Sequence, residues 1–213
     1  MVKVKICGIT NLEDALAATE YGADAIGFVF APESPRFVPT DRIRKIVSAL
    51  PPFVATVGVF TAGDEKEIRD AVAESGVDLI QFHGPFSSDL IRSFSSRAIQ
   101  VLRVGGENEG RLDERALYSA RTFLLDTFHP KLLGGSGISF NWNIALEAKK
   151  YGRVILAGGL TPENVEEAIE QVRPYGVDVS SGVEMRKGKK DFAKMKRFIE
   201  AAKRAGGGHA SSR

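Results

Sequence analysis

The sequence predicts a single-domain α/β protein of the (β/α)8 TIM-barrel class. Short runs rich in Val, Ile and Phe recur along the chain, and each is followed by a stretch with helical periodicity. Eight such units share 213 residues, at roughly 27 residues each, which is near the lower size limit of this fold. We place the barrel at residues 1–205 and expect a flexible, glycine-rich tail over 206–213. A doubly wound open sheet is the competing architecture.

The expected strands are short and largely apolar. Several carry apolar residues on both faces, which is typical of parallel strands that are covered by helices. The eight runs, in chain order, are VKVKIC (2–7), AIGFVF (25–30), VATVGVF (54–60), DLIQFH (78–83), IQVLRV (99–104), TFLLD (122–126), VILA (154–157) and VDVSS (177–181).

The stretches between these runs place apolar residues three and four positions apart with charged residues between them, which is the pattern of an amphipathic helix. Thr161 before Pro162 predicts a helix N-cap. Gly22, Gly76 and Gly152 follow final helical turns, where we expect left-handed C-caps. The expected helices are 12–20, 42–50, 65–75, 89–96, 113–120, 144–151, 162–172 and 191–204.

Composition limits the classes of function. The net charge is only +2, so nothing in the overall charge indicates a nucleic acid or a membrane surface as partner. One cysteine cannot form an internal disulfide, which fits a reducing compartment. No apolar run approaches the roughly 20 residues of a membrane helix, and the N-terminus lacks the core of a signal peptide. We therefore expect a cytoplasmic protein.

Two residues at strand ends are candidates for catalysis. Cys7 ends the first expected strand, in KICGIT (5–10), and Asp126 ends the sixth. Barrel enzymes place their reactive groups at such carboxyl ends of strands. From the local pattern alone, the simpler interpretations are core packing for the thiol and a cap or loop hydrogen bond for the carboxylate. A buried carboxylate is costly unless it is paired or used, so both interpretations stay open.

Two glycine-bearing turns predict an anion site. LAGGLTPENV (156–165) leads from a strand into a helix through Gly158 and Gly159, and DVSSGVE (178–184) turns in the same way. Glycine lets backbone N–H groups approach an anion, and barrels often bind phosphate after strands seven and eight. Tight turns alone are the alternative. The residues that we expect to bind the substrate here are Gly158, Gly159, Asp178, Ser180, Ser181 and Gly182.

Three further features surround the expected site. Arg36 lies in SPRFVPT (34–40), where two prolines stiffen the loop, and it suits a carboxylate or phosphate, with a solvated surface arginine as the alternative. His83 ends the fourth strand and is a candidate for substrate contact, with a packed or solvated histidine as the alternative. The long connection from 127 to 140 is a candidate lid, with Gly134, Gly135, Ser136 and Gly137 at its tip. The three histidines show no metal-ligand spacing, and we expect no metal site.

Taken together, these strings resemble the phosphoribosylanthranilate isomerase family. The matching strings are KICGIT, GADAIGFVF, SPRFV, VGVF, IQFHG, LLDT, GGSGISFNW, LAGGLTPENV and VDVSSGVE, in order over nearly the whole chain. The resemblance implies a barrel isomerase of tryptophan biosynthesis that catalyses an Amadori rearrangement of N-(5-phosphoribosyl)anthranilate and needs no cofactor. It implies that Cys7 is the general base, that Asp126 is the general acid, that Arg36 binds the anthranilate carboxylate, and that the two late glycine turns bind phosphate.

The chain departs from the family pattern at two positions, and two rival functions remain. Asn141 replaces the usual Asp before Trp142, and Phe82 replaces a Leu.

The related isomerase of histidine biosynthesis carries an aspartate where this chain has Cys7, which favours the anthranilate substrate. A phosphosugar-binding barrel without catalysis is the rival from another class. The sequence permits a monomer or a homodimer, with Phe53 or Phe60 as candidate partner contacts.

Overall fold

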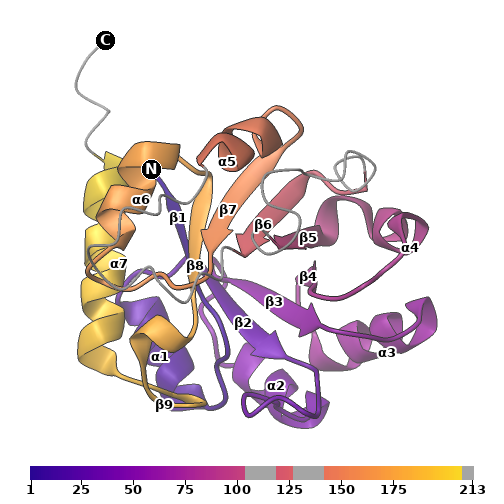
Figure 1. The fold of residues 1–213 in the computed structure, drawn as a ribbon. Helices are drawn as coiled ribbons and strands as arrows, with labels where there is room; N and C mark the ends of the chain where they lie inside the picture. Colours follow the sequence, from indigo (N-terminus) through magenta and orange to yellow (C-terminus); the bar gives the residue numbers. More distant parts are fainter. Residues whose placement is uncertain (104–118, 127–141, 208–213) are drawn as a thin grey trace.

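A computed structural model describes residues 1–103, 119–126 and 142–207 as a closed barrel of eight parallel strands (Figure 1). Neighbouring strands follow chain order, and β1 pairs with β8 to close the barrel. The (β/α)8 prediction is confirmed and the open sheet is excluded. The strands are β1 (Lys3–Ile6), β2 (Ala25–Val29), β3 (Ala55–Phe60), β4 (Leu79–Phe82), β5 (Ala98–Arg103), β6 (Thr122–Asp126), β7 (Arg153–Ala157) and β8 (Gly176–Val179).

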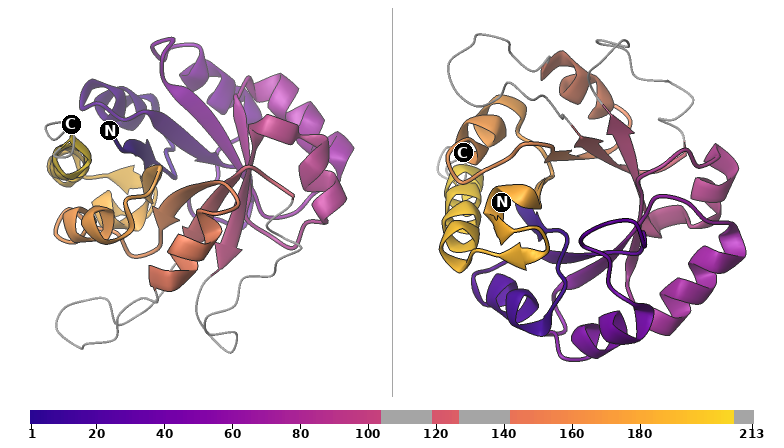
Figure 2. Two further views of the ribbon diagram at one scale, coloured as in Figure 1. Left: turned by 90° about the horizontal axis from the view of Figure 1, so that it is seen from above. Right: turned by 60° about the horizontal axis from the view of Figure 1, so that its bottom comes forward.

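Helices surround these strands, as the second view of Figure 2 shows. They are α1 (Leu12–Glu20), α2 (Thr40–Val47), α3 (Glu65–Ser75), α4 (Ser88–Ser93), α5 (Trp142–Ala148), α6 (Val165–Val172) and α7 (Phe192–Gly207). The helix expected over 113–120 falls mostly outside the described residues. So do positions 208–213 of the expected tail, whereas its first two residues belong to α7.

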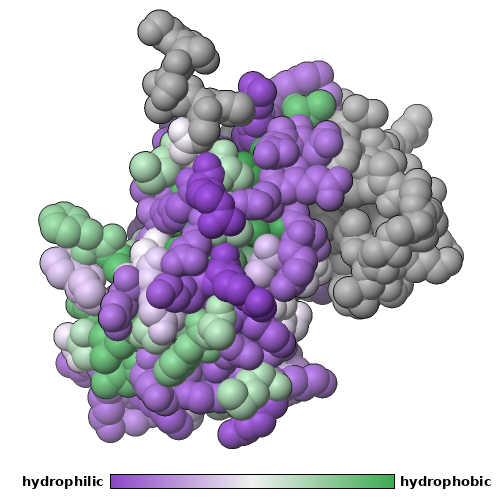
Figure 3. All heavy atoms as spheres, turned by 90° about the vertical axis from the view of Figure 1, so that its left-hand side faces the viewer, coloured by the Kyte–Doolittle hydropathy of each residue, from purple (hydrophilic) through white to green (hydrophobic). Residues whose placement is uncertain are grey.

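The core has two layers. One fills the barrel interior with side chains such as Val57, Ile99, Leu124 and Ile155. The larger layer lies between the strands and the helices. Helix α7 shows how the sequence produces the outer layer, because it buries Met195, among others, and turns its charged side chains outward. The face of the molecule on this side is mainly hydrophilic (Figure 3). No helix in the described ranges is long and apolar enough to cross a membrane.

Two of the expected helix ends differ in the structure. Gly22 and Gly76 have the predicted positive φ of 99° and 76°, but Gly152 does not. A Cβ at Gly152 would lie 2.5 Å from the Arg121 carbonyl oxygen, so glycine serves close backbone packing there. The Thr161 hydroxyl accepts from the Glu163 backbone as a cap would, yet regular helix begins only at Val165, after an irregular first turn.

A short hairpin after β8 was not expected. A 3-10 turn, η3 (Ser181–Val183), leads into β9 (Glu184–Arg186), which pairs antiparallel with β10 (Lys189–Lys190). Gly188 between them has a φ of 78°, the left-handed conformation that glycine adopts without strain. The hairpin carries charged side chains back toward the carboxyl end of β1, which is where the candidate site lies.

Candidate active site

A cavity of about 380 Å³ opens at the carboxyl ends of the strands. It brings together every candidate residue that the described part of the chain contains: Cys7, Arg36, His83, Asp126, Gly158, Gly159, Asp178, Ser180, Ser181 and Gly182. The lid candidates at 134–137 and the departure at Asn141 lie outside the described residues. Residues from six strands or the segments that follow them therefore face one space, as the barrel topology requires.

Cys7 is buried, with 7% of its surface exposed, and it still lines the cavity. Its backbone N–H donates to the Val179 carbonyl at 2.8 Å, which ties the end of β1 to β8. Burial raises the pKa of the thiol, while the ammonium of Lys5 opposes that shift. The local prediction of a packed cysteine and the prediction of a site residue are therefore both compatible with its position.

Asp126 and His83 lie side by side at the ends of β6 and β4. The His83 Nε2 atom is 3.6 Å from the Asp126 Oδ2 atom. Burial raises the pKa of the Asp126 carboxyl, with His83 opposing the shift, and burial also lowers the pKa of the His83 imidazole. Both effects favour neutral groups, so Asp126 is suited to hold a proton that it can donate.

The two glycine turns contact each other at the cavity. A Cβ at Gly182 would lie 2.0 Å from the Leu160 carbonyl oxygen, so only glycine permits this approach. Gly158 and Gly159 have φ of 81° and 70°. The Asn164 side chain holds the first turn by donating to the Gly159 carbonyl at 3.0 Å and accepting from the Thr161 N–H at 2.8 Å. Rigid turns with glycine at the closest points suit an anionic group.

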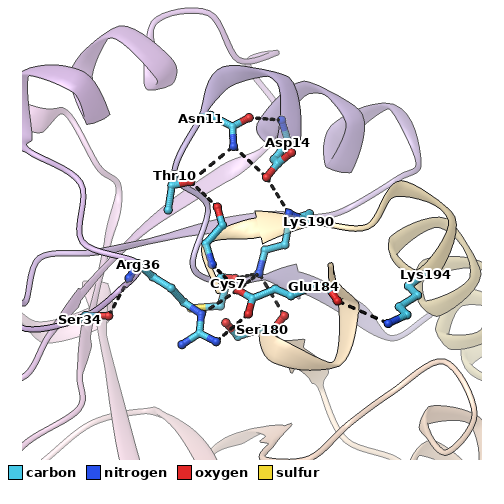
Figure 4. Close-up of polar contacts among 11 residues, drawn as sticks. Cys7, Thr10, Asn11, Asp14, Ser34, Arg36, Ser180, Glu184, Lys190 and Lys194 are labelled. Carbon is cyan, nitrogen blue, oxygen red and sulfur yellow. Dashed lines mark hydrogen bonds and ion pairs between the residues drawn. The ribbon is translucent and has the colours of Figure 1, made fainter. Parts of the chain in front are cut away.

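Arg36 is held by a carboxylate that the sequence analysis missed. Its Nε and Nη2 atoms each donate to Glu184 at 2.7 Å, in a bidentate pair drawn in Figure 4. Although burial works in the opposite direction, the arginine and Lys190 lower the pKa of the Glu184 carboxyl. The pairing uses the Nε and Nη2 side of the guanidinium of Arg36, which also lines the cavity.

Lys190 is a second residue that the sequence analysis missed. Its side chain is fully buried, and its Nζ atom donates to the Cys7 carbonyl at 2.6 Å, the Ser180 carbonyl at 3.1 Å and Glu184 at 3.2 Å (Figure 4). Its backbone N–H donates to the buried Asp14 at the start of α1. One ammonium thus joins the end of β1, the turn after β8 and the carboxylate that holds Arg36.

A buried ion pair and a buried glutamine also lie within the barrel. Lys5 and Asp178 form an ion pair of 2.9 Å, and both side chains are nearly inaccessible to solvent. Gln81, two residues before His83, lines the cavity. Its Oε1 atom is buried and has no hydrogen-bond partner among the described residues. Lys5 and Gln81 at inward positions of barrel strands were the features of the sequence that could have indicated these groups.

The described residues contain no group of three or more His, Cys, Asp or Glu side chains placed to hold a metal ion. This part of the site presents a carboxyl group with a raised pKa, a thiol, a guanidinium and two glycine turns. Such a set fits acid–base catalysis on a phosphorylated, carboxylate-bearing molecule.

Comparison with known proteins identifies the family. Residues 4–201 match the family model described as N-(5'phosphoribosyl)anthranilate (PRA) isomerase. N-(5'-phosphoribosyl)anthranilate isomerase from Geobacter metallireducens is 49% identical over 203 residues, which are 95% of this chain and 100% of the relative.

Two solved structures of such isomerases are also similar. One is a phosphoribosyl anthranilate isomerase in complex with reduced 1-(o-carboxyphenylamino)-1-deoxyribulose 5-phosphate, with a TM-score of 0.82 and 44% identity. The other describes monomers generated from the dimeric enzyme of Thermotoga maritima, with a TM-score of 0.81 and 42% identity. Each alignment covers 95% of this chain and 99% of the other.

Replacing Lys190 by methionine tests the buried connection between β1, the turn after β8 and Glu184. We expect Lys190→Met to lower the free energy of unfolding by about 3 kcal/mol, because it removes the buried cation paired with Glu184 and the donor that the Cys7 and Ser180 carbonyls share. Urea denaturation measures this loss. The control is Lys187→Met, since Lys187 is exposed on the same hairpin and should change stability by less than about 0.5 kcal/mol. Equal stability of the two variants would contradict the structural role of Lys190.

Proposed function

The chain belongs to the N-(5'-phosphoribosyl)anthranilate isomerase family of tryptophan biosynthesis, and we propose that Cys7 is its general base and Asp126 its general acid. The observation that carries this proposal is the cavity, which gathers both residues with Arg36 and the two glycine turns. The reaction rearranges N-(5-phosphoribosyl)anthranilate into 1-(2-carboxyphenylamino)-1-deoxyribulose 5-phosphate. We propose the cytoplasm as its location, because the composition favours it.

Ring opening is the first step. The furanose oxygen takes the proton of the Asp126 carboxyl, the bond between C1′ and that oxygen breaks, and the nitrogen lone pair forms a protonated Schiff base. Asp126 must carry a proton when substrate is bound. The raised pKa of its buried carboxyl supports this state, and a nearby phosphorylated substrate favours it further.

Proton removal from C2′ is the second step. The thiolate of Cys7 takes this proton, and the electron pair of the C–H bond moves toward the iminium nitrogen to give an enolamine. Tautomerisation then yields the ketone. The hydrogen at C2′ is acidic because it adjoins the Schiff base. Acid and base come from β6 and β1, which lie on different sides of the barrel mouth and so can act at different atoms.

Substrate orientation follows from the charges at the cavity wall. The ligand of the similar enzyme carries a carboxylate at one end and a phosphate at the other. In the proposed orientation, Arg36 binds the carboxylate, and the turns at Gly158 and Gly182 bind the phosphate. The Gln81 Oε1 atom, which has no hydrogen-bond partner within the described ranges, would accept from a sugar hydroxyl. His83 lies beside the proposed acid and contacts the sugar in this arrangement.

Single substitutions separate the two proposed catalytic roles from binding. We expect Cys7→Ser and Asp126→Asn each to lower kcat by about 10²–10⁴-fold, since each removes one proton-transfer group. Substrate is generated in situ, and turnover is followed by loss of its anthranilate-type fluorescence. Calorimetric titration with a product analogue should show that both variants still bind. Near-native kcat in either variant would exclude that residue from its role.

Failure of the native protein itself would have a different meaning. If the native protein binds the analogue but does not turn over phosphoribosylanthranilate, the histidine-pathway substrate is the next one to assay. Binding without turnover of either substrate would indicate a phosphosugar-binding protein.

Arg36→Met tests the carboxylate contact. We expect KM to rise by about 10-fold or more with little change in kcat, because the contact exists in both the ground state and the transition state. Steady-state kinetics measures this difference. The control is Arg42→Met, which removes an exposed arginine from α2 and should leave KM unchanged. An unchanged KM in Arg36→Met would show that the carboxylate is bound elsewhere.

We also propose that two copies associate through the opposite end of the barrel. Phe60 is buried and stacks on Phe30, whereas Phe53 is 98% exposed. Phe53 borders a second cavity of about 360 Å³ at the amino ends of the strands. A large exposed aromatic side chain beside a hollow favours a protein interface, and the similar enzyme from Thermotoga maritima is dimeric.

Phe53→Asp tests this assembly. We expect the native protein to have twice the mass of the 23.1 kDa chain in light scattering and the variant to be a monomer. Leu146→Asp alters another exposed apolar residue, on α5, and should stay dimeric. A monomeric native protein would overturn the proposed assembly and leave the active-site proposal untouched, because the two cavities lie at opposite ends of the strands.

A further inference from the structure

The interior of the barrel holds a charged pair where apolar side chains are usual. Lys5 on β1 and Asp178 on β8 are direct partners in the strand register, and their side chains meet at 2.9 Å. Side chains inside such barrels are mainly branched and apolar. A buried ion pair is weak support for stability, because desolvation offsets much of the attraction. The pair therefore calls for a role other than stability.

Its position points to Cys7. Lys5 and Cys7 are two residues apart at the end of β1, so both side chains point into the barrel. Gly27 stands beside them on β2. A Cβ at Gly27 would lie 2.8 Å from the Cys7 Sγ atom and 3.1 Å from the Lys5 Nζ atom. Because that position carries no side chain, the thiol and the ammonium border the same small space.

We propose that Lys5 is a positioning residue whose ammonium, fixed by Asp178, stabilises the thiolate form of Cys7. The inference rests on the proposed function in one respect, namely that the thiolate accepts the C2′ proton. A hydrogen bond or ion pair from the ammonium to sulfur favours the anion that must form before this transfer. During the step the C–H bond breaks, the S–H bond forms, and Lys5 keeps its own proton.

Other charged groups also lie around the thiol, but the hydrogen bonds of Glu184 and Lys190 go to groups other than the sulfur. Glu184 binds both Arg36 and Lys190, and Lys190 also binds the Cys7 carbonyl rather than the sulfur. Burial raises the pKa of Cys7, Asp178 raises it further, and Lys5 has the largest opposing effect. In the part of the chain that the structure describes, the charged or titratable groups around the thiol are Lys5 from β1, Arg36 from the segment after β2, His83 after β4, Asp126 from β6, Asp178 from β8, Glu184 from β9 and Lys190 from β10.

The test titrates the thiol directly. Cys7 is the only cysteine of the chain, so thiolate absorbance in the ultraviolet and alkylation by iodoacetamide both report on this residue alone. Removing a neighbouring cation raises the pKa of a thiol. We therefore expect Lys5→Met to titrate about one pH unit or more above the native protein. Lys5→Arg keeps the charge and should restore most of the difference. Lys3→Met removes a solvent-exposed lysine from the same strand and should not shift the titration.

The outcomes separate this inference from the proposed base. An unshifted titration in Lys5→Met, or an equal shift in Lys3→Met, overturns the role of Lys5 whatever the activity. Lys5→Gln removes the same charge and keeps a donor for Asp178, so it replaces Lys5→Met if the latter does not fold. In the pH profile of kcat/KM, the acidic limb should move upward together with the thiol titration. Undiminished turnover in Cys7→Ser would instead refute the base, while the titration still reports on Lys5.

Discussion

Pairing of β1 with β8 is the constraint on which the rest of the structure depends. It closes the barrel and sets a register in which Lys5 faces Asp178. The same pairing brings the end of β1 beside the turn that follows β8, through the hydrogen bond from the Cys7 N–H to the Val179 carbonyl. Parallel strands send all their carboxyl ends to one rim, so the thiol, Asp126 and the glycine turns face one cavity without any special loop.

The hairpin after β8 supplies two charged side chains that hold other groups of this rim in place. Glu184 and Lys190 place opposite charges in a region of low solvent access, where each needs its partners. The carboxylate fixes the guanidinium of Arg36 by two hydrogen bonds, and the ammonium fixes two backbone carbonyls. Because these groups are already oriented in the absence of a ligand, binding requires little further loss of conformational entropy from them.

Local patterns predicted most of the fold. All eight strands lie where runs of apolar residues indicated them, and α1 and α3 match their expected ranges. The left-handed C-cap predicted at Gly152 is wrong. Glycine is needed there because the backbone packs against the Arg121 carbonyl, which is distant in sequence, and not because a helix ends there. The candidate site residues of the described chain share one cavity, but the partners of Arg36 and Cys7 were missed. Glu184 lies 148 residues from Arg36, and pairing over such separations depends on closure of the barrel, which local periodicity does not report.

Closure by the first and last strands also has a consequence for synthesis of the chain. The two members of the Lys5–Asp178 pair are 173 residues apart. During translation Lys5 emerges early and has no buried partner until β8 has followed. Bringing such distant segments together requires a large loss of chain entropy before any contact compensates for it. The rim with its thiol therefore depends on the strand pairing that joins the two ends of the barrel sequence.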